Sequence, residues 1–171
     1  MSDMKSLFLR RQIMHIRRVQ DNMLLLENNL NRLPFRVRNF ELAKRGMLHD
    51  SDKVTFRIKN YFEIFKHFKF VREGIGDGGD IISADMVQKY ARRHYLSQRH
   101  HMEYHIKNKI PLSGVDICEI ACDLYAIKEE LGETAEKTES FVIGFCKKFS
   151  IGDAQRKKLL FLLNLLGELT R

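Results

Sequence analysis

The chain has 171 residues, of which 44% are hydrophobic and 30% are charged, with only two prolines and ten glycines. This length suits one domain, which we expect to span 1–171, and the composition argues against a disordered or fibrous chain. The net charge is +8, and residues 1–72 hold sixteen lysines and arginines against seven acidic residues, which predicts a phosphorylated partner unless these charges are ordinary solvated helix faces.

Apolar residues recur at the helical period along most of the chain. They predict helices over 4–32, 38–48, 55–71, 84–107, 116–131, 135–149 and 153–169. Pro34 would stop the first helix, and Ser83 would cap the fourth. No stretch shows strand alternation for longer than four or five residues. We therefore predict an all-α fold, a bundle of about six to seven helices.

The glycine-rich segment Gly74–Asp80 separates the third and fourth predicted helices. A phosphate-binding loop would follow a strand, whereas this segment follows a helix and lacks the expected lysine. We interpret it as a flexible connection that could act as a lid. The last helix is apolar nearly all round, which predicts burial in the core or in an oligomer interface such as that of a homodimer.

The cysteines indicate the compartment. Cys118, Cys122 and Cys146 do not form the two pairs that a zinc knot needs, so we expect buried, reduced thiols and a reducing, cytoplasmic setting. No secretory leader is visible, and the longest apolar stretch, Leu159–Leu169, is too short to cross a bilayer. We expect no membrane association.

Two histidines of the first half are placed for metal chemistry. His15 lies on or beside the apolar stripe of the first helix, where a lone histidine is more often a core residue than a ligand. The adjacent pair His49 and Asp50, at the predicted end of the second helix, offers a nitrogen and an oxygen that suit Zn, Mn or Fe. Because adjacent helical side chains diverge by about 100°, both reach one ion only if the helix end distorts or the ion sits between them. The alternative is a helix-terminal polar pair.

Four more histidines fall within twelve residues, His94 to His105. On one continuous helix, His94, His101 and His105 would share a face and His100 would point elsewhere. His101 and His105 could then share an ion, whereas His94 would be two turns from His101 unless the helix ends before His100. The alternative is a polar helix face above packed tyrosines.

Three carboxylates, Asp116, Glu119 and Asp123, share one face of an otherwise apolar helix. A carboxylate in such a helix is costly to bury without a cation. Asp123 is the strongest candidate of the three for a metal ligand.

In chain order, His15, the His49–Asp50 pair and Asp123 resemble the H…HD…D signature of the HD-domain metal-dependent phosphohydrolase superfamily. The stretch LHDSDKV resembles the family's Leu-His-Asp-x-x-Lys-hydrophobic motif, and EIACDLYA resembles its last metal-binding helix. The chain looks closest to a small branch with a His-His-x-Glu-Tyr segment, here His100–Tyr104. The resemblance covers about 8–130, so 135–169 would complete the core or an interface.

The resemblance implies an HD-like helical bundle with one or two divalent ions of Mn, Fe, Co or Zn. His15, His49, Asp50 and Asp123 would hold an ion that activates water for attack on phosphorus. Relatives with a second metal add histidines in the interval that holds His94, His100 and His101, with Asp50 as the bridge. Which of His100 and His101 points inward stays open.

The remaining roles also follow from the resemblance. Lys53 would hold a substrate phosphate or the departing oxygen, and Arg11 and Arg18, one turn either side of His15, would contact phosphate. Glu119 is expected either to orient a ligand or to transfer a proton. Asp52 departs from the pattern, because relatives often have a small residue there.

We therefore expect a phosphohydrolase acting on a nucleotide or another phosphate ester. Two alternatives remain. One is a di-iron oxygenase, because related HD folds can hold two irons. The other is a non-catalytic basic module that binds nucleic acid or a protein partner and needs no metal.

Overall fold

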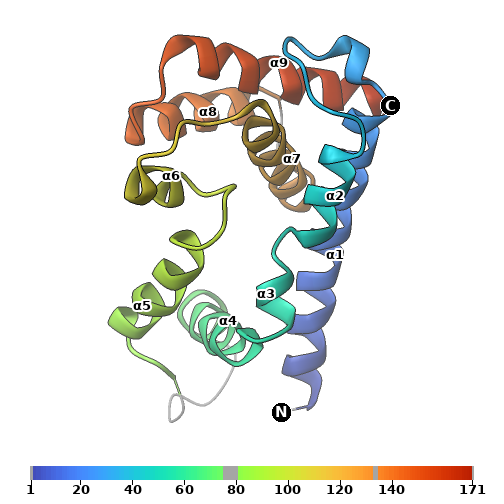
Figure 1. Ribbon diagram of the computed structural model, residues 1–171. Coiled ribbons are helices and arrows are strands. Elements are labelled where there is room, and N and C mark those ends of the chain that lie inside the picture. The colour runs from blue at the N-terminus through green and yellow to red at the C-terminus, as the bar shows by residue number, and fades with distance from the viewer. Residues whose placement is uncertain (1, 75–80, 133–134, 171) are drawn as a thin grey trace.

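The computed structural model describes residues 2–74, 81–132 and 135–170 (Figure 1). This part of the chain contains helices and no strand, which confirms the predicted all-α fold. Figure 1 shows α8 (Ala135–Lys148) and α9 (Asp153–Leu169) at one end of the long α1 (Ser2–Glu27), with α4 (Ile58–Glu73) and α5 (Ala84–Tyr95) near the other end.

The core forms where α1 packs against α2 (Glu41–Leu48) and α7 (Gly114–Leu131). Val19, Met23 and Leu26 of α1 are fully buried there. Helix α7 is buried on most of its circumference, and its start is fixed by a capping box in which Ser113 and Asp116 bond each other's backbone amides. These contacts hold the centre of α7 against the middle of α1.

The last helix joins this core. Leu159, Leu162 and Leu166 of α9 are fully buried, and the helix packs on α7 and on α8. The first helix is shorter than predicted, since α1 ends at Glu27 and Leu30–Arg32 forms a single 3-10 turn before Pro34. The side-chain amide of Asn29 donates a hydrogen bond to the backbone carbonyl of Leu25 at 2.8 Å, which satisfies an acceptor at this helix end.

The predicted helix over 84–107 is wrong, because the structure breaks it into α5 and α6 (Met102–Asn108). The amide of Ser97 donates to the His94 carbonyl at 2.9 Å, and the Ser97 hydroxyl donates to the same carbonyl at 3.0 Å. These bonds close α5, whose N-cap is Ser83 as predicted. The break contains neither glycine nor proline, so periodicity alone does not reveal it.

Helix α4 ends at Glu73, and Gly74 is its C-cap with a φ of 64°. Most of the predicted glycine-rich lid, residues 75–80, lies outside the described residues. Cys118, Cys122 and Cys146 are free and buried, as expected. Among the described residues, no helix has both the length and the hydropathy needed to cross a membrane.

Candidate metal centre

Asp50 sits at a break between two helices. Helix α2 ends at Leu48, α3 (Ser51–Val54) follows at once, and Asp50 between them has a left-handed backbone with φ 52°. Aspartate tolerates this conformation better than most residues. The break supplies the helix-end distortion that an adjacent His-Asp pair needs, and it leaves His49 and Asp50 both buried.

The first group of ligand atoms joins α1, the α2–α3 break and α7. His15 Nε2 lies 3.0 Å from Asp123 Oδ1 and 3.8 Å from Asp50 Oδ2. His49 Nε2 lies 3.5 Å from the same Asp50 oxygen and 3.8 Å from the same Asp123 oxygen. Ligand atoms on one ion at about 2.0–2.2 Å are roughly 3–3.6 Å apart. The four residues predicted as the core ligand set therefore meet at separations close to those of a metal site.

The second group lies on the other oxygen of the same carboxylate. Asp50 Oδ1 is 3.0 Å from His94 Nε2 and 3.3 Å from His100 Nε2. A ligand atom of His101 lies within 4.8 Å of the ligand atoms of all three. Both His100 and His101 thus point inward, which answers the question that the sequence left open.

Several buried polar atoms here have no hydrogen-bond partner among the described residues. They are His49 Nε2, Asp50 Oδ1, His94 Nε2, His101 Nε2 and both ring nitrogens of His100. A buried polar atom without a partner costs about 1–3 kcal/mol, and such atoms are rare in native proteins. Their concentration around one carboxylate fits one or two divalent cations, because imidazole and carboxylate together suit Zn, Mn or Fe.

A second layer of carboxylates orients the histidines. His15 Nδ1 is 2.8 Å from Glu130 Oε1, His49 Nδ1 is 3.1 Å from Glu119 Oε1, and His94 Nδ1 is 3.0 Å from Asp52 Oδ2. When Nδ1 carries the proton and donates to a carboxylate, Nε2 is left with its lone pair facing the centre. This arrangement is the usual support of metal-binding histidines.

Each of these outer carboxylates has an arginine. Arg45 donates to Glu119 at 2.8 Å, Arg57 lies 3.0 Å from Asp52, and Arg18 donates to Glu130 at 3.5 Å. Arg18, predicted as a phosphate contact, is thus engaged by a carboxylate. Arg11, the other predicted phosphate contact, is exposed on α1.

Glu130, Arg45 and Arg57 were not predicted from the sequence, and Asp52 was predicted only as a departure from the family pattern. A signal for Glu130 existed, because it lies seven residues after Asp123 and so shares its helix face. Asp52 was not identifiable in the same way, since its partner His94 comes from a distant helix.

Electrostatics keep the carboxylates ionised. Burial alone would raise the pKa of Asp50, but the charge of Lys53 and the neighbouring imidazoles outweigh it and hold that pKa well below 3.8. Burial likewise opposes ionisation of Glu119, yet the adjacent imidazoles of His100 and His49 lower its pKa to about 2. The pKa of His101 falls to about 2, first because of burial and then because of His100 and His94. His101 is thus held neutral, the form that binds metal, whereas neighbouring carboxylates overcome burial and raise the pKa of His15 to about 9 and that of His100 to about 10, so metal binding there would release protons.

Lys53 reaches the same carboxylate. Its Nζ forms an ion pair with Asp50 Oδ2 and lies 5.4 Å from the centre of the Tyr61 ring. Burial alone would lower the pKa of Lys53, but Asp50 and Asp123 raise it, so the ammonium stays charged. The predicted phosphate-binding lysine is therefore at the edge of the centre.

Two residues from the sequence analysis lie elsewhere. His105 faces two backbone carbonyls, that of Arg99 at 2.7 Å from Nε2 and that of Ile110 at 3.0 Å from Nδ1, so the expected sharing of an ion with His101 is wrong. Asp116 is held by Arg99, by Arg45 and by its capping bond to Ser113.

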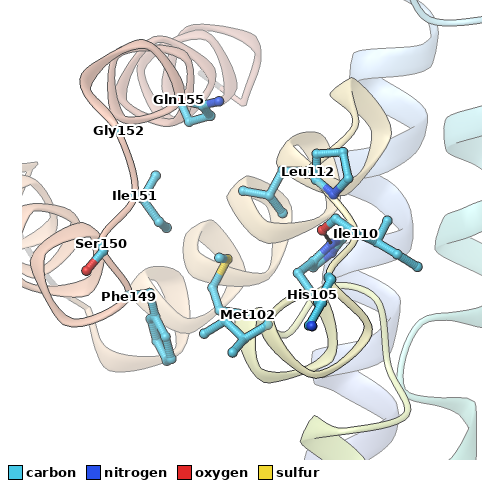
Figure 2. Close-up of a pocket in the computed structure, with 12 residues that line it drawn as sticks. Met102, His105, Ile110, Leu112, Phe149, Ser150, Ile151, Gly152 and Gln155 are labelled. Atoms are coloured by element: carbon cyan, nitrogen blue, oxygen red, sulfur yellow. Dashed lines mark hydrogen bonds between the residues drawn. The ribbon is translucent and has the colours of Figure 1, made fainter.

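A pocket of about 450 Å³ lies apart from the metal centre. Figure 2 shows Ile151 and Gly152, between α8 and α9, across this pocket from Leu112. None of the candidate metal ligands lines it. It is therefore distinct from the centre around Asp50.

Comparison with known proteins gives a family and no function. No curated protein matches the chain, and no solved structure matches it either. Residues 4–164 match a family described as a family of unknown function, DUF5662. The matched range includes every candidate ligand of the metal centre. The chain therefore belongs to the family of unknown function DUF5662.

Proposed function

We propose that this protein is a metal-dependent phosphohydrolase of the HD type, acting on a nucleotide or another phosphate ester. One observation carries the proposal: both oxygens of Asp50 face buried imidazole nitrogens, Oδ2 that of His49 and Oδ1 those of His94 and His100. A bridging carboxylate between two nitrogen-rich groups suits a pair of divalent transition metals.

Seven residues would hold the metals. His15, His49 and Asp123 would bind the first ion, His94, His100 and His101 the second, and Asp50 both. The ions would activate water and neutralise charge on the phosphoryl oxygens. Water's oxygen would bond to phosphorus as the ester P–O bond breaks, and the departing oxygen would take up a proton.

The chain's own cations and carboxylates would place the substrate. The Lys53 ammonium pairs with Asp50 and its side chain is 17% exposed, so it would be able to bind a phosphate oxygen beside the ligands. Both carboxylate oxygens of Glu119 are already engaged, Oε1 by His49 and Oε2 by Arg45. This supports a positioning role for Glu119 over proton transfer. The basic residues of 1–72 favour an anionic substrate, and the three buried thiols fit a reducing, cytoplasmic setting.

The test begins with metal analysis of the purified protein, followed by hydrolysis of phosphate esters in the presence of Mn, Co, Fe or Zn. Asp50→Ala should lose metal and activity together, whereas Asp85→Ala, at an exposed aspartate of α5, should keep both. Absence of both metal and phosphatase activity would favour the non-catalytic binding module. Full metal content in Asp50→Ala would refute the ligand set.

The second group, which is rich in histidine nitrogens, supports one further candidate function. Three histidines with one carboxylate also suit non-haem iron, so a di-iron oxygenase has a specific observation in its favour. Iron content, a visible absorption band and oxygen consumption would separate it from a phosphohydrolase. A phosphatase active with Mn or Zn and silent toward oxygen would exclude it.

A further inference from the structure

A second pocket, of about 420 Å³, adjoins the metal centre between α5–α6 and α8. Four aromatic side chains line it, namely Tyr95, Phe141, Phe145 and Phe149. Phe141 is 52% exposed and Tyr95 37% exposed, so the chain itself leaves these rings partly uncovered. A pocket of this volume and lining accommodates a small planar molecule.

The pocket and the metal centre share a wall. His101 lines the pocket and belongs to the second group of candidate ligands, and its Nε2 is buried without a hydrogen-bond partner among the described residues. Tyr95 also lines the pocket, and its ring packs on that of His101 at a tilt of 58° with ring centres 4.5 Å apart. A molecule bound in this pocket would therefore contact His101, a candidate metal ligand.

His101 differs from the other histidines of the centre. The Nδ1 atoms of His15, His49 and His94 each face a carboxylate, whereas no hydrogen bond or ion pair joins His101 to a carboxylate in the part of the chain that the structure describes. With Nε2 directed at the metal, Nδ1 carries a proton that needs an acceptor. A molecule in the adjoining pocket can supply it.

Gly144 of α8 gives an independent reason to think that the pocket holds a ligand. Glycine inside a helix is destabilising relative to alanine, because it loses more backbone entropy on folding. No atom lies within 4 Å of a Cβ built at Gly144, so packing within the chain does not require the glycine. The space above it belongs to the pocket. Any larger side chain there would take volume from an occupant.

We propose that this pocket binds a planar heteroaromatic group, the organic part of the ester substrate, with an acceptor atom facing His101. The aromatic walls would stack on the ring, and Glu103 and Lys148 at the pocket would interact with its polar edges. This inference rests on the proposed function, and it narrows the substrate to esters whose alcohol carries an aromatic ring, nucleotides among them.

The experiment compares two probes on the metal-loaded protein, adenosine 5′-monophosphate and glycerol 3-phosphate, by calorimetric binding and by hydrolysis. In the series Gly144, Gly144→Ala and Gly144→Leu, affinity for adenosine monophosphate relative to glycerol phosphate should fall with side-chain size, about tenfold or more at leucine. Phe141→Ala should lower the same ratio about fivefold to tenfold, as loss of one stacking partner does. Phe161→Ala, a comparably exposed phenylalanine of α9 outside the pocket, should not change it.

The outcomes separate the two proposals. If the ratio of affinities for adenosine monophosphate and glycerol phosphate were equal in all variants, the pocket assignment would be overturned. Phosphatase activity would then still test the proposed function independently. Binding of adenosine monophosphate that does not compete with glycerol phosphate would also overturn it, because the two would then occupy separate sites. If neither probe is hydrolysed, the binding ratios still decide the pocket, and the phosphohydrolase proposal alone fails.

Discussion

Lys53 and Asp50, three residues apart, form an ion pair at the carboxylate that both histidine groups face. In the structure the ammonium contacts Oδ2, the oxygen that also faces His49. A metal ion at that oxygen would replace part of the positive charge that Lys53 supplies. Lys53 would then be released to bind a phosphate oxygen. The same side chain would neutralise Asp50 in the metal-free state and the substrate phosphate in the metal-bound state.

Lys53→Gln should keep the metals and lose substrate binding. A charge-assisted hydrogen bond contributes about 1.5–3 kcal/mol, so kcat/KM should fall roughly tenfold to hundredfold, mainly through KM. Steady-state kinetics and metal analysis on the same preparation check this. Lys59→Gln, at an exposed lysine of α4, is the matched control. A Lys53 variant with unchanged kinetics would remove it from the site.

Metal stoichiometry should differ among ligand variants. His15→Ala should lose the first ion and keep the second, His94→Ala should do the reverse, and Asp50→Ala should lose both, because one Asp50 oxygen faces His15 and the other faces His94 and His100. Elemental analysis of dialysed protein measures this. His67→Ala, whose side chain bonds the Ile82 carbonyl outside the centre, should bind as much metal as the unaltered chain. Parallel loss of all metal in His94→Ala would argue for a single ion.

Glu119→Gln should weaken metal binding without removing a ligand. Glutamine keeps the shape but loses the charge that orients His49 and pairs with Arg45. Outer carboxylates of this kind typically contribute tenfold to a hundredfold in metal affinity. Competition with a chelator of known affinity gives the value, and Glu129→Gln, an exposed glutamate on the same helix, is the comparison. Equal affinities would mean that His49 is held by packing alone.

Asp116 predicts how stability depends on acid. Burial opposes its ionisation, but the bonds from Arg99 and Ser113 lower its pKa from 3.8 to about 2. Because the folded pKa lies below the unfolded one, the stabilisation, roughly 2 kcal/mol, is complete above pH 4 and disappears as the pH falls toward 2. Asp116→Asn should be less stable at pH 6 and show a flatter loss of unfolding free energy below pH 4, as followed by urea titrations. Identical acid profiles would contradict this account.

The core ligand set was predictable from its resemblance to a known signature. The His49–Asp50 pair, His15 and Asp123 are each weak signals alone, and their order and flanking residues, which resemble the HD pattern, predicted them as one set. The structure brings these four together.

The arrangement of His94, His100 and His101 was not predictable from periodicity. It depends on the end of α5 at Tyr95, where the chain turns and carries His100 inward. The turn is held in part by the bond between His105 and the Arg99 carbonyl, a contact between residues of the turn and of the next helix. Helical periodicity assumes a continuous helix, so it assigned His100 to the wrong side.

The origin of the ligands has a mechanical consequence. Helix α5 packs against α4 and α6, whereas the core is formed by α1, α2, α7, α8 and α9, with Met102 of α6 at its edge. Metals held by Asp50 would crosslink these two parts through His94, His100 and His101. Removal of the metals by a chelator should then speed amide hydrogen exchange in α5 and α6, while exchange in α7 and α9 stays slow. The ions would thus set the stiffness of the molecule as well as its chemistry.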